Sequence, residues 1–143
     1  MNLDAIEKVL VWLLIFGVLI YEIWFYLRGR SSLKWKQHPA KVVSVYVNVR
    51  DNDGTEESSP SIKYEYFFNG SLYTGKRYAY GDIWSRNYGD STRKISSIHV
   101  GRSIDIYVNP KHPNQSVVRK GYTGNILLEI VFLGIALVGI AVS

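Results

Sequence analysis

The chain has 143 residues, of which 47% are hydrophobic, and it carries a formal net charge of +5. This length accommodates one domain with membrane anchors, but it is too short for two domains with anchors. Because the chain contains no cysteine, thiol catalysis, disulfide bonds and thiolate metal sites are excluded.

After a short tail of residues 1–8, an apolar run covers residues 9–27 with Glu22 as its only charge. The run approaches the roughly 20 residues that cross the hydrocarbon core of a bilayer. A cleaved signal peptide would start with basic residues and end on small ones, whereas this run ends before two arginines, as a stop-transfer segment does. We therefore expect residues 9–27 to form an uncleaved transmembrane helix.

Basic side chains are concentrated beside the apolar ends of the chain, and residues 28–39 form a basic linker. Anionic lipid headgroups attract such residues by roughly 1 kcal/mol each. The aromatic residues that follow alternate with polar ones, as on strand faces, so nucleic-acid stacking is not needed to explain them. The predicted lipid-headgroup contacts are Arg28, Arg30, Lys34, Lys36, Lys41, Arg119 and Lys120.

Residues 41–50 are rich in β-branched residues and follow the period of two that is typical of a strand. The quartet Asp51-Asn52-Asp53-Gly54 ends this strand as a turn. It is not a calcium loop, because its glycine comes two positions too early for the EF-hand spacing and no helices flank it. A polar loop is expected over residues 55–61.

Residues 62–68 and 72–78 are predicted to pair as a hairpin around Asn69-Gly70, which is the strongest short-range signal for a two-residue turn. The tyrosines of this hairpin are expected to belong to an aromatic surface that contacts a protein partner. The residues of this predicted partner surface are Tyr64, Tyr66, Tyr73 and Tyr78.

The rest of the polar segment predicts one helix and two strands. Residues 91–98 are expected to form a short helix capped by Asp90 or Ser91. Residues 103–108 alternate as a strand, and residues 115–119 predict a short final strand after a proline-containing turn. Five strands and one helix over residues 40–121 predict a small, mostly antiparallel β barrel or sandwich.

A second apolar stretch, residues 122–142, is predicted to form a second transmembrane helix. Glu129 is its only acidic residue, and its last three turns are apolar on every face, unlike an amphipathic core helix. The expected fold class is therefore an α+β membrane protein, with two transmembrane helices flanking the β-rich domain.

Two motifs occur together in the β-rich domain. The first is the hairpin strand Tyr64-Glu65-Tyr66 with its Asn69-Gly70 turn, and the second is Val108-Asn109-Pro110 followed by Pro113. Over roughly residues 40–121, the chain resembles the bacterial domain-of-unknown-function family 3592. The resemblance implies a β-rich domain beside one or two membrane helices in a bacterial envelope, and it transfers no catalytic residue. Some relatives lie beside secreted toxin systems, so the resemblance also admits an immunity role.

Enzyme motifs are absent from the sequence. The three histidines match no zinc-site pattern, no G-x-S-x-G elbow occurs, and the glycine spacings match no phosphate-binding loop. A site assembled from distant residues would draw on Arg86, Asp90 and His99. We expect no catalysis, cofactor, metal site or small-molecule substrate.

The sequence thus predicts a membrane-anchored module that contacts membrane lipids and a protein partner. One alternative is an immunity protein that neutralises a toxin acting at the membrane. A second is a subunit of an oligomeric transporter or channel, because two helices cannot line a pore alone. The basic flanks favour a multi-pass protein of the bacterial inner membrane with its β-rich domain in the cytoplasm.

Overall fold

The computed structural model describes residues 3–81, 84–124 and 134–135. The chain divides into two compact units. One unit comprises Met1–Leu27 with Asn125–Ser143, and the other, Arg28–Gly124, is called here the β domain.

The first unit contains most of helix α1, which runs from Leu3 to Ser32. Its segment Ile6–Ser32 has a mean hydropathy of 2.1 in its most apolar window and is long enough to cross a membrane. The helix predicted over residues 9–27 is therefore confirmed as a helix. It continues to Ser32 because its last residues pack within the β domain.

The second predicted transmembrane helix, residues 122–142, falls largely outside the described residues. Its first residues, 122–124, belong to the β domain and follow an irregular path. In the described part of the chain, α1 is the one helix with the length and composition of a span.

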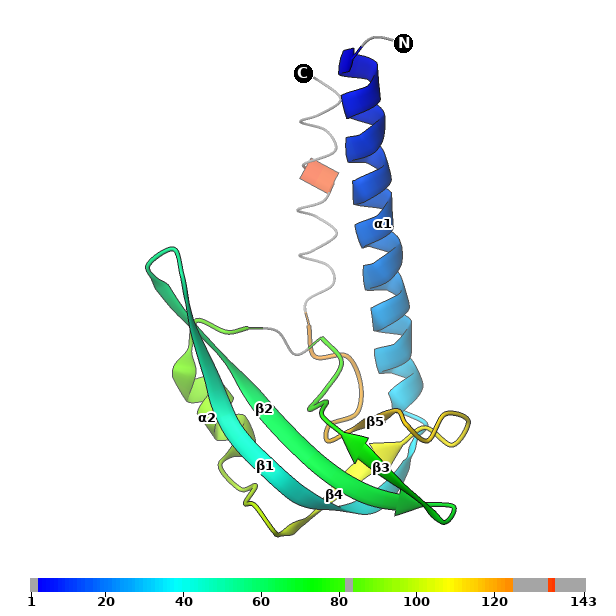
Figure 1. Ribbon diagram of the computed structural model, residues 1–143, viewed down its shortest axis with the longest axis vertical. Helices are drawn as coiled ribbons and strands as arrows, with labels where there is room; N and C mark the ends of the chain where they lie inside the picture. Colours follow the sequence, from blue (N-terminus) through cyan, green and yellow to red (C-terminus); the bar gives the residue numbers. More distant parts are fainter. Residues whose placement is uncertain (1–2, 82–83, 125–133, 136–143) are drawn as a thin grey trace. The chain divides into compact units, whose positions relative to one another are not determined.

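The β domain is built on a five-stranded sheet in the order β3-β2-β1-β4-β5, in which every neighbouring pair is antiparallel (Figure 1). The strands are β1 (Lys36–Asn52), β2 (Thr55–Phe68), β3 (Ser71–Gly75), β4 (Ser103–Val108) and β5 (Ser116–Val117). The prediction of a closed barrel or a sandwich was wrong. The sheet stays open because β3 and β5 end it on opposite sides, and β5 is too short to extend it further.

Two tight turns lie at opposite ends of β2 and connect it to β1 and to β3. Asn69 and Gly70 have φ values of 48° and 81°, and Asp53 and Gly54 have 50° and 77°. Positive φ at both central residues is typical of the type I′ turn, whose twist matches that of paired strands. The Asn69-Gly70 hairpin is thus confirmed.

The predicted loop over residues 55–61 was wrong, because these residues form the first half of β2. The turn at Asp53 sends the chain directly back along β1, so Asn52 faces Thr55 and Val47 faces Pro60. Cross-strand pairing here outweighs the polar composition that indicated a loop.

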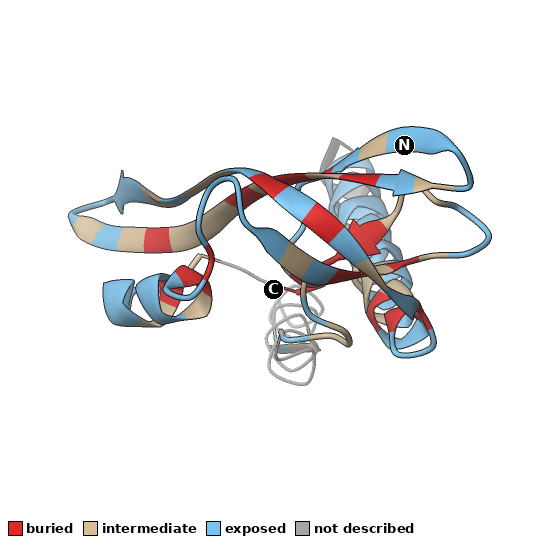
Figure 2. Cartoon of the chain, turned by 90° about the horizontal axis from the view of Figure 1, so that it is seen from below, coloured by how far each residue is buried: buried red, intermediate tan, exposed pale blue. Residues whose placement is uncertain are grey.

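The core lies on one face of the sheet, between the strands and helix α2 (Tyr88–Ile95). Buried and exposed residues alternate along the long strands, and α2 lies beneath the sheet (Figure 2). Ile95 and Ile98 pack here against buried strand residues such as Val42 and Ile106. The helix starts earlier than predicted, because Asn87 caps it by accepting a hydrogen bond from the Gly89 N–H at 3.0 Å.

Candidate functional site

The two ends of the β domain are joined at what we call the base, formed by residues 28–35 and 117–124. The Ser32 hydroxyl accepts a hydrogen bond from the Gly121 N–H at 2.8 Å and donates one to the Gly29 carbonyl at 2.6 Å. The Trp35 ring packs edge-on against Tyr80, with 6.0 Å between the ring centroids. The segments that enter and leave the domain therefore lie side by side.

The sheet face opposite α2, called here the outer face, carries a groove of about 320 Å³. Its lining residues come from β1, β2 and β3 and from the start of β4: His38, Pro39, Ala40, Lys41, Glu65, Tyr66, Phe67, Leu72 and Ser103. Register places Lys41 directly opposite Glu65, and Phe67 directly opposite Leu72. The groove thus combines a charged pair with an apolar pair.

The apolar pair of the outer groove is exposed to solvent. Phe67 retains 66% of its accessible surface and Leu72 retains 55%. Side chains directly opposite each other on one face of an antiparallel sheet have Cβ atoms about 4.5 to 5.5 Å apart, so the two form one patch. An exposed patch beside hydrogen-bonding side chains is a surface that can bind an apolar side chain of a ligand.

The predicted partner surface lies mainly on the other face. Tyr64 and Tyr66 are 0% and 2% exposed, which places them in the core rather than on a surface. Tyr73 is half-buried and stacks on Tyr66, and Tyr78 also packs against the core. The alternation along these strands identified residues that share a face, but no local pattern indicated which face carries the core.

Burial of the two core tyrosines is accompanied by hydrogen bonding of their hydroxyls. The Tyr64 hydroxyl donates to the Arg77 carbonyl at 3.2 Å and lies 3.0 Å from the Ser116 hydroxyl, while the Tyr66 hydroxyl donates to the Pro113 carbonyl at 2.6 Å. Burial raises the pKa of Tyr64 far above its ordinary value and also raises the pKa of Tyr66. These hydroxyls are structural proton donors, and their buried positions do not suit them to bind a ligand.

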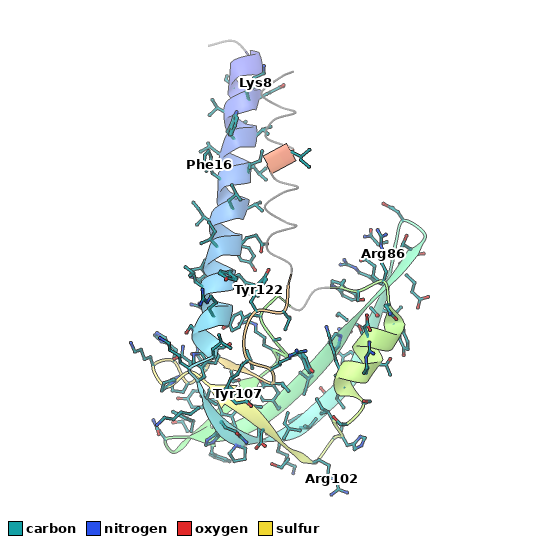
Figure 3. All side chains as sticks on the ribbon, turned by 180° about the vertical axis from the view of Figure 1, so that it is seen from behind. Lys8, Phe16, Arg86, Arg102, Tyr107 and Tyr122 are labelled. Atoms are coloured by element: carbon teal, nitrogen blue, oxygen red, sulfur yellow. The ribbon has the colours of Figure 1, made fainter. Side chains whose placement is uncertain are left out.

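The predicted headgroup contacts fall in two places. Arg28, Arg30, Lys34, Lys36, Arg119 and Lys120 lie in or beside the two segments of the base. Lys41 lies instead in the outer groove, opposite Glu65. Lys120 is held 4.3 Å from the centre of the Tyr107 ring, a residue of β4 labelled in Figure 3.

The structure also brings Arg119 together with two basic residues that sequence reasoning did not single out. Arg93 and Lys94 from the last turn of α2 line a polar cavity of about 410 Å³ with Arg119. Asp90 lines it too, and its carboxylate pairs with Arg93. Nothing in the spacing of α2 and Arg119 along the sequence indicates that they share a cavity.

The candidate catalytic residues Arg86, Asp90 and His99 do not form one site in the described structure. Asp90 is engaged by Arg93, whereas Arg86 and His99 are exposed. Within the described ranges there is no group of three or more histidine or acidic residues that could hold a metal ion.

Comparison with protein families shows to which family the chain belongs. A family model described as Domain of unknown function (DUF3592) matches residues 38–123. The chain belongs to this family. The match covers the sheet from β1 to β5 together with α2, so the DUF3592 domain coincides with most of the β domain. No curated protein and no solved structure matches the chain.

Proposed function

We propose that this DUF3592 protein is a membrane-anchored protein-interaction module without catalytic activity. In this proposal, α1 is the anchor and the outer groove is the binding surface. The observation that supports it most strongly is the exposed Phe67–Leu72 pair beside the Lys41–Glu65 pair, within one groove of about 320 Å³.

The proposed ligand is an extended segment of a protein partner. An apolar side chain would pack on the patch that Phe67 and Leu72 form, and the opposite charges of Lys41 and Glu65 would orient polar groups of the same segment. Strand β3 ends the described sheet on this side, so its outer edge can pair with an extended backbone. Pairing of this kind supplies affinity through the main chain, and the apolar pocket supplies specificity.

The proposed localisation is the bacterial inner membrane, with residues 122–142 as a second anchor and the β domain in the cytoplasm. The base supports this arrangement because residues 28–35 and 117–124 meet there. A protein anchored at both ends needs both chain segments to leave its domain at adjacent points. The basic residues beside them, such as Arg30 and Arg119, are then suited to contact anionic headgroups.

The proposal is tested by comparative purification from native membranes. We expect a protein that co-purifies in stoichiometric amount with the wild-type chain to be lost with Phe67→Glu and with Leu72→Glu. Val100→Glu is the matched control, because Val100 is an exposed valine outside the groove, with 62% of its surface accessible. Recovery of the same partner with all three variants, or of no stoichiometric partner with the wild type, would contradict the proposal.

A further inference from the structure

Strand β1 has an open edge over its second half. On the side away from β2, β4 pairs with β1 only as far as Lys41, and the loop before β4 pairs with Val42 through Gly101 and Arg102. From Val43 to Asn52, no described strand pairs with β1 on this side (Figure 1). We refer to residues 43–49 as the β1 edge.

Two features of β2 show which backbone groups the β1 edge presents. Pro60 has no N–H to donate, and it faces Val47. Ser58 faces Val49, and its N–H and carbonyl both bond to Ser85 at 2.7 Å, away from β1. Both pairs are therefore non-hydrogen-bonded positions of the β1–β2 ladder. By alternation, the N–H and carbonyl groups of Val45, Val47 and Val49 point to the open edge.

The β1 edge lacks the features that usually protect an open strand. It contains no charged residue, proline or glycine, whereas natural edges are commonly shielded by lysine, proline or short length. The open side of β2 carries Pro60, and β5 is short. Helix α2 packs mainly against β2 and makes a smaller contact with β1. Tyr46, in the middle of this edge, is 54% exposed.

The pattern of polar and apolar residues along the β1 edge is symmetric about Tyr46. In an antiparallel pair with Tyr46 opposite the same residue of another copy, Val45 faces Val47 and Val43 faces Val49. The polar residues Ser44 and Asn48 also face each other. In this register, Val45 of one copy can exchange backbone hydrogen bonds with Val47 of the other, because both residues present their N–H and carbonyl groups to the open edge.

Charged residues lie at both ends of the β1 edge. Lys41 and Arg102 lie at one end of the β1 edge, and Arg50 and Asp51 lie at the other. Figure 3 shows Arg102 extending from the loop before β4. Antiparallel pairing brings the end of one copy that carries Arg50 and Asp51 to the end of the other that carries Lys41 and Arg102, beyond the residues 43–49 that pair.

We propose that the β1 edge is the interface of a two-fold symmetric homodimer, in which two sheets join into one. The partner is a second copy of this chain, and the contact is isologous, as is usual for dimers. The interface lies on the opposite side of the sheet from the β3 edge. It therefore does not depend on the proposed function of the outer groove.

Cysteine cross-linking of the full chain in native membranes tests the register, because the natural chain has no cysteine. Opposed residues at non-hydrogen-bonded positions have Cα atoms about 4.5 Å apart, within the range of about 4.4 to 6.8 Å found in disulfides. We expect Tyr46→Cys to form a disulfide-linked dimer under mild oxidation. Ser44→Cys and Asn48→Cys should do so at least tenfold less when expressed alone, but should cross-link to each other when co-expressed.

Equal cross-linking of all three single variants would indicate random collision and would overturn the proposal. So would the absence of any Tyr46→Cys dimer in protein that retains the wild-type unfolding transition. Two substitutions of opposite charge at Val49 provide a second test. In the proposed register, Val49 faces the end of the other copy that carries Lys41 and Arg102. We expect Val49→Lys to reduce the dimer at least tenfold relative to Val49→Glu, and equal dimerisation of the two variants would contradict the proposed register.

Discussion

The hydroxyl of Ser32 and the backbone N–H of Gly121 are hydrogen-bonded at 2.8 Å, although 89 positions separate them in the sequence. Ser32 is fully buried at the end of α1, so this bond closes the base of the β domain. It links the segment that enters the domain to the segment that leaves it.

Replacement of Ser32 by alanine should destabilise the β domain. The substitution removes the acceptor for the Gly121 N–H, and an unsatisfied buried donor costs about 1 to 3 kcal/mol. Denaturant unfolding should report a loss in this range, and hydrogen exchange at Gly121 should accelerate. Ser97→Ala, at an exposed position, is the control and should change neither quantity. Unchanged exchange at Gly121 in Ser32→Ala would contradict this role of the bond.

Replacement of Gly75 by alanine should be more disruptive than its small size suggests. A Cβ atom at this position would overlap the ring of Tyr64 and would lie 2.6 Å from the Ser116 hydroxyl oxygen. Overpacking of a core costs about 1 to 3 kcal/mol, so thermal unfolding should shift clearly downward. Thr74→Ala, at the exposed neighbouring position of β3, should leave the transition nearly unchanged. Equal stability of the two variants would show that Tyr64 does not lie over Gly75.

The stability that Tyr64 contributes should depend on pH at the alkaline end. Burial raises the pKa of Tyr64 above its ordinary value of 10.0, so the folded state favours the neutral phenol. Its contribution is complete below pH 10.0 and decreases as the pH rises above that value. Tyr64→Phe should therefore be less stable than wild type at neutral pH, and the difference should shrink under alkaline conditions. Tyr88→Phe, at an exposed position, provides the control. A stability difference between Tyr64→Phe and wild type that stays constant with pH would be inconsistent with the burial of Tyr64.

The tip of the β1–β2 hairpin should weaken in acid. The Arg50 guanidinium donates to the Glu57 carboxylate at 2.8 and 2.9 Å, and this bond lowers the pKa of Glu57 below its ordinary value of 4.5. The contribution of Glu57 is present above pH 4.5 and is lost as the pH falls through the lowered pKa. Glu57→Gln should remove this pH dependence, whereas Glu56→Gln should keep it. Proton titration by NMR measures the effect, and an unshifted Glu57 would refute it.

How much of this fold the sequence predicts depends on how local each signal is. Asn69-Gly70 specifies its own turn, because both residues tolerate positive φ, and the hairpin was predicted from that dipeptide. Asp53-Gly54 carries a similar signal, but the polar residues after it suggested a loop. Their strand conformation depends on pairing with β1, which is not encoded in their own hydrophobicity.

The candidate surfaces were harder to predict, because they depend on contacts between distant segments. Tyr64 and Phe67 are both aromatic residues of β2, yet one is fully buried and the other is mostly exposed. The difference follows from which face of the sheet carries the core: Tyr64 belongs to the core cluster, whereas Phe67 lies on the outer face. In the same way, the open edge of β1 follows from where β4 stops, and no residue of β1 indicates that limit.

Site-specific photo-cross-linking tests the central proposal most directly. A photoreactive amino acid would be introduced at Phe67 in the full chain, in native membranes, with Val100 as the matched exposed position outside the groove. A membrane-anchored interaction module predicts one discrete protein adduct from position 67 and none from position 100. The absence of an adduct at position 67, or the same adducts from both positions, would contradict the proposed binding surface.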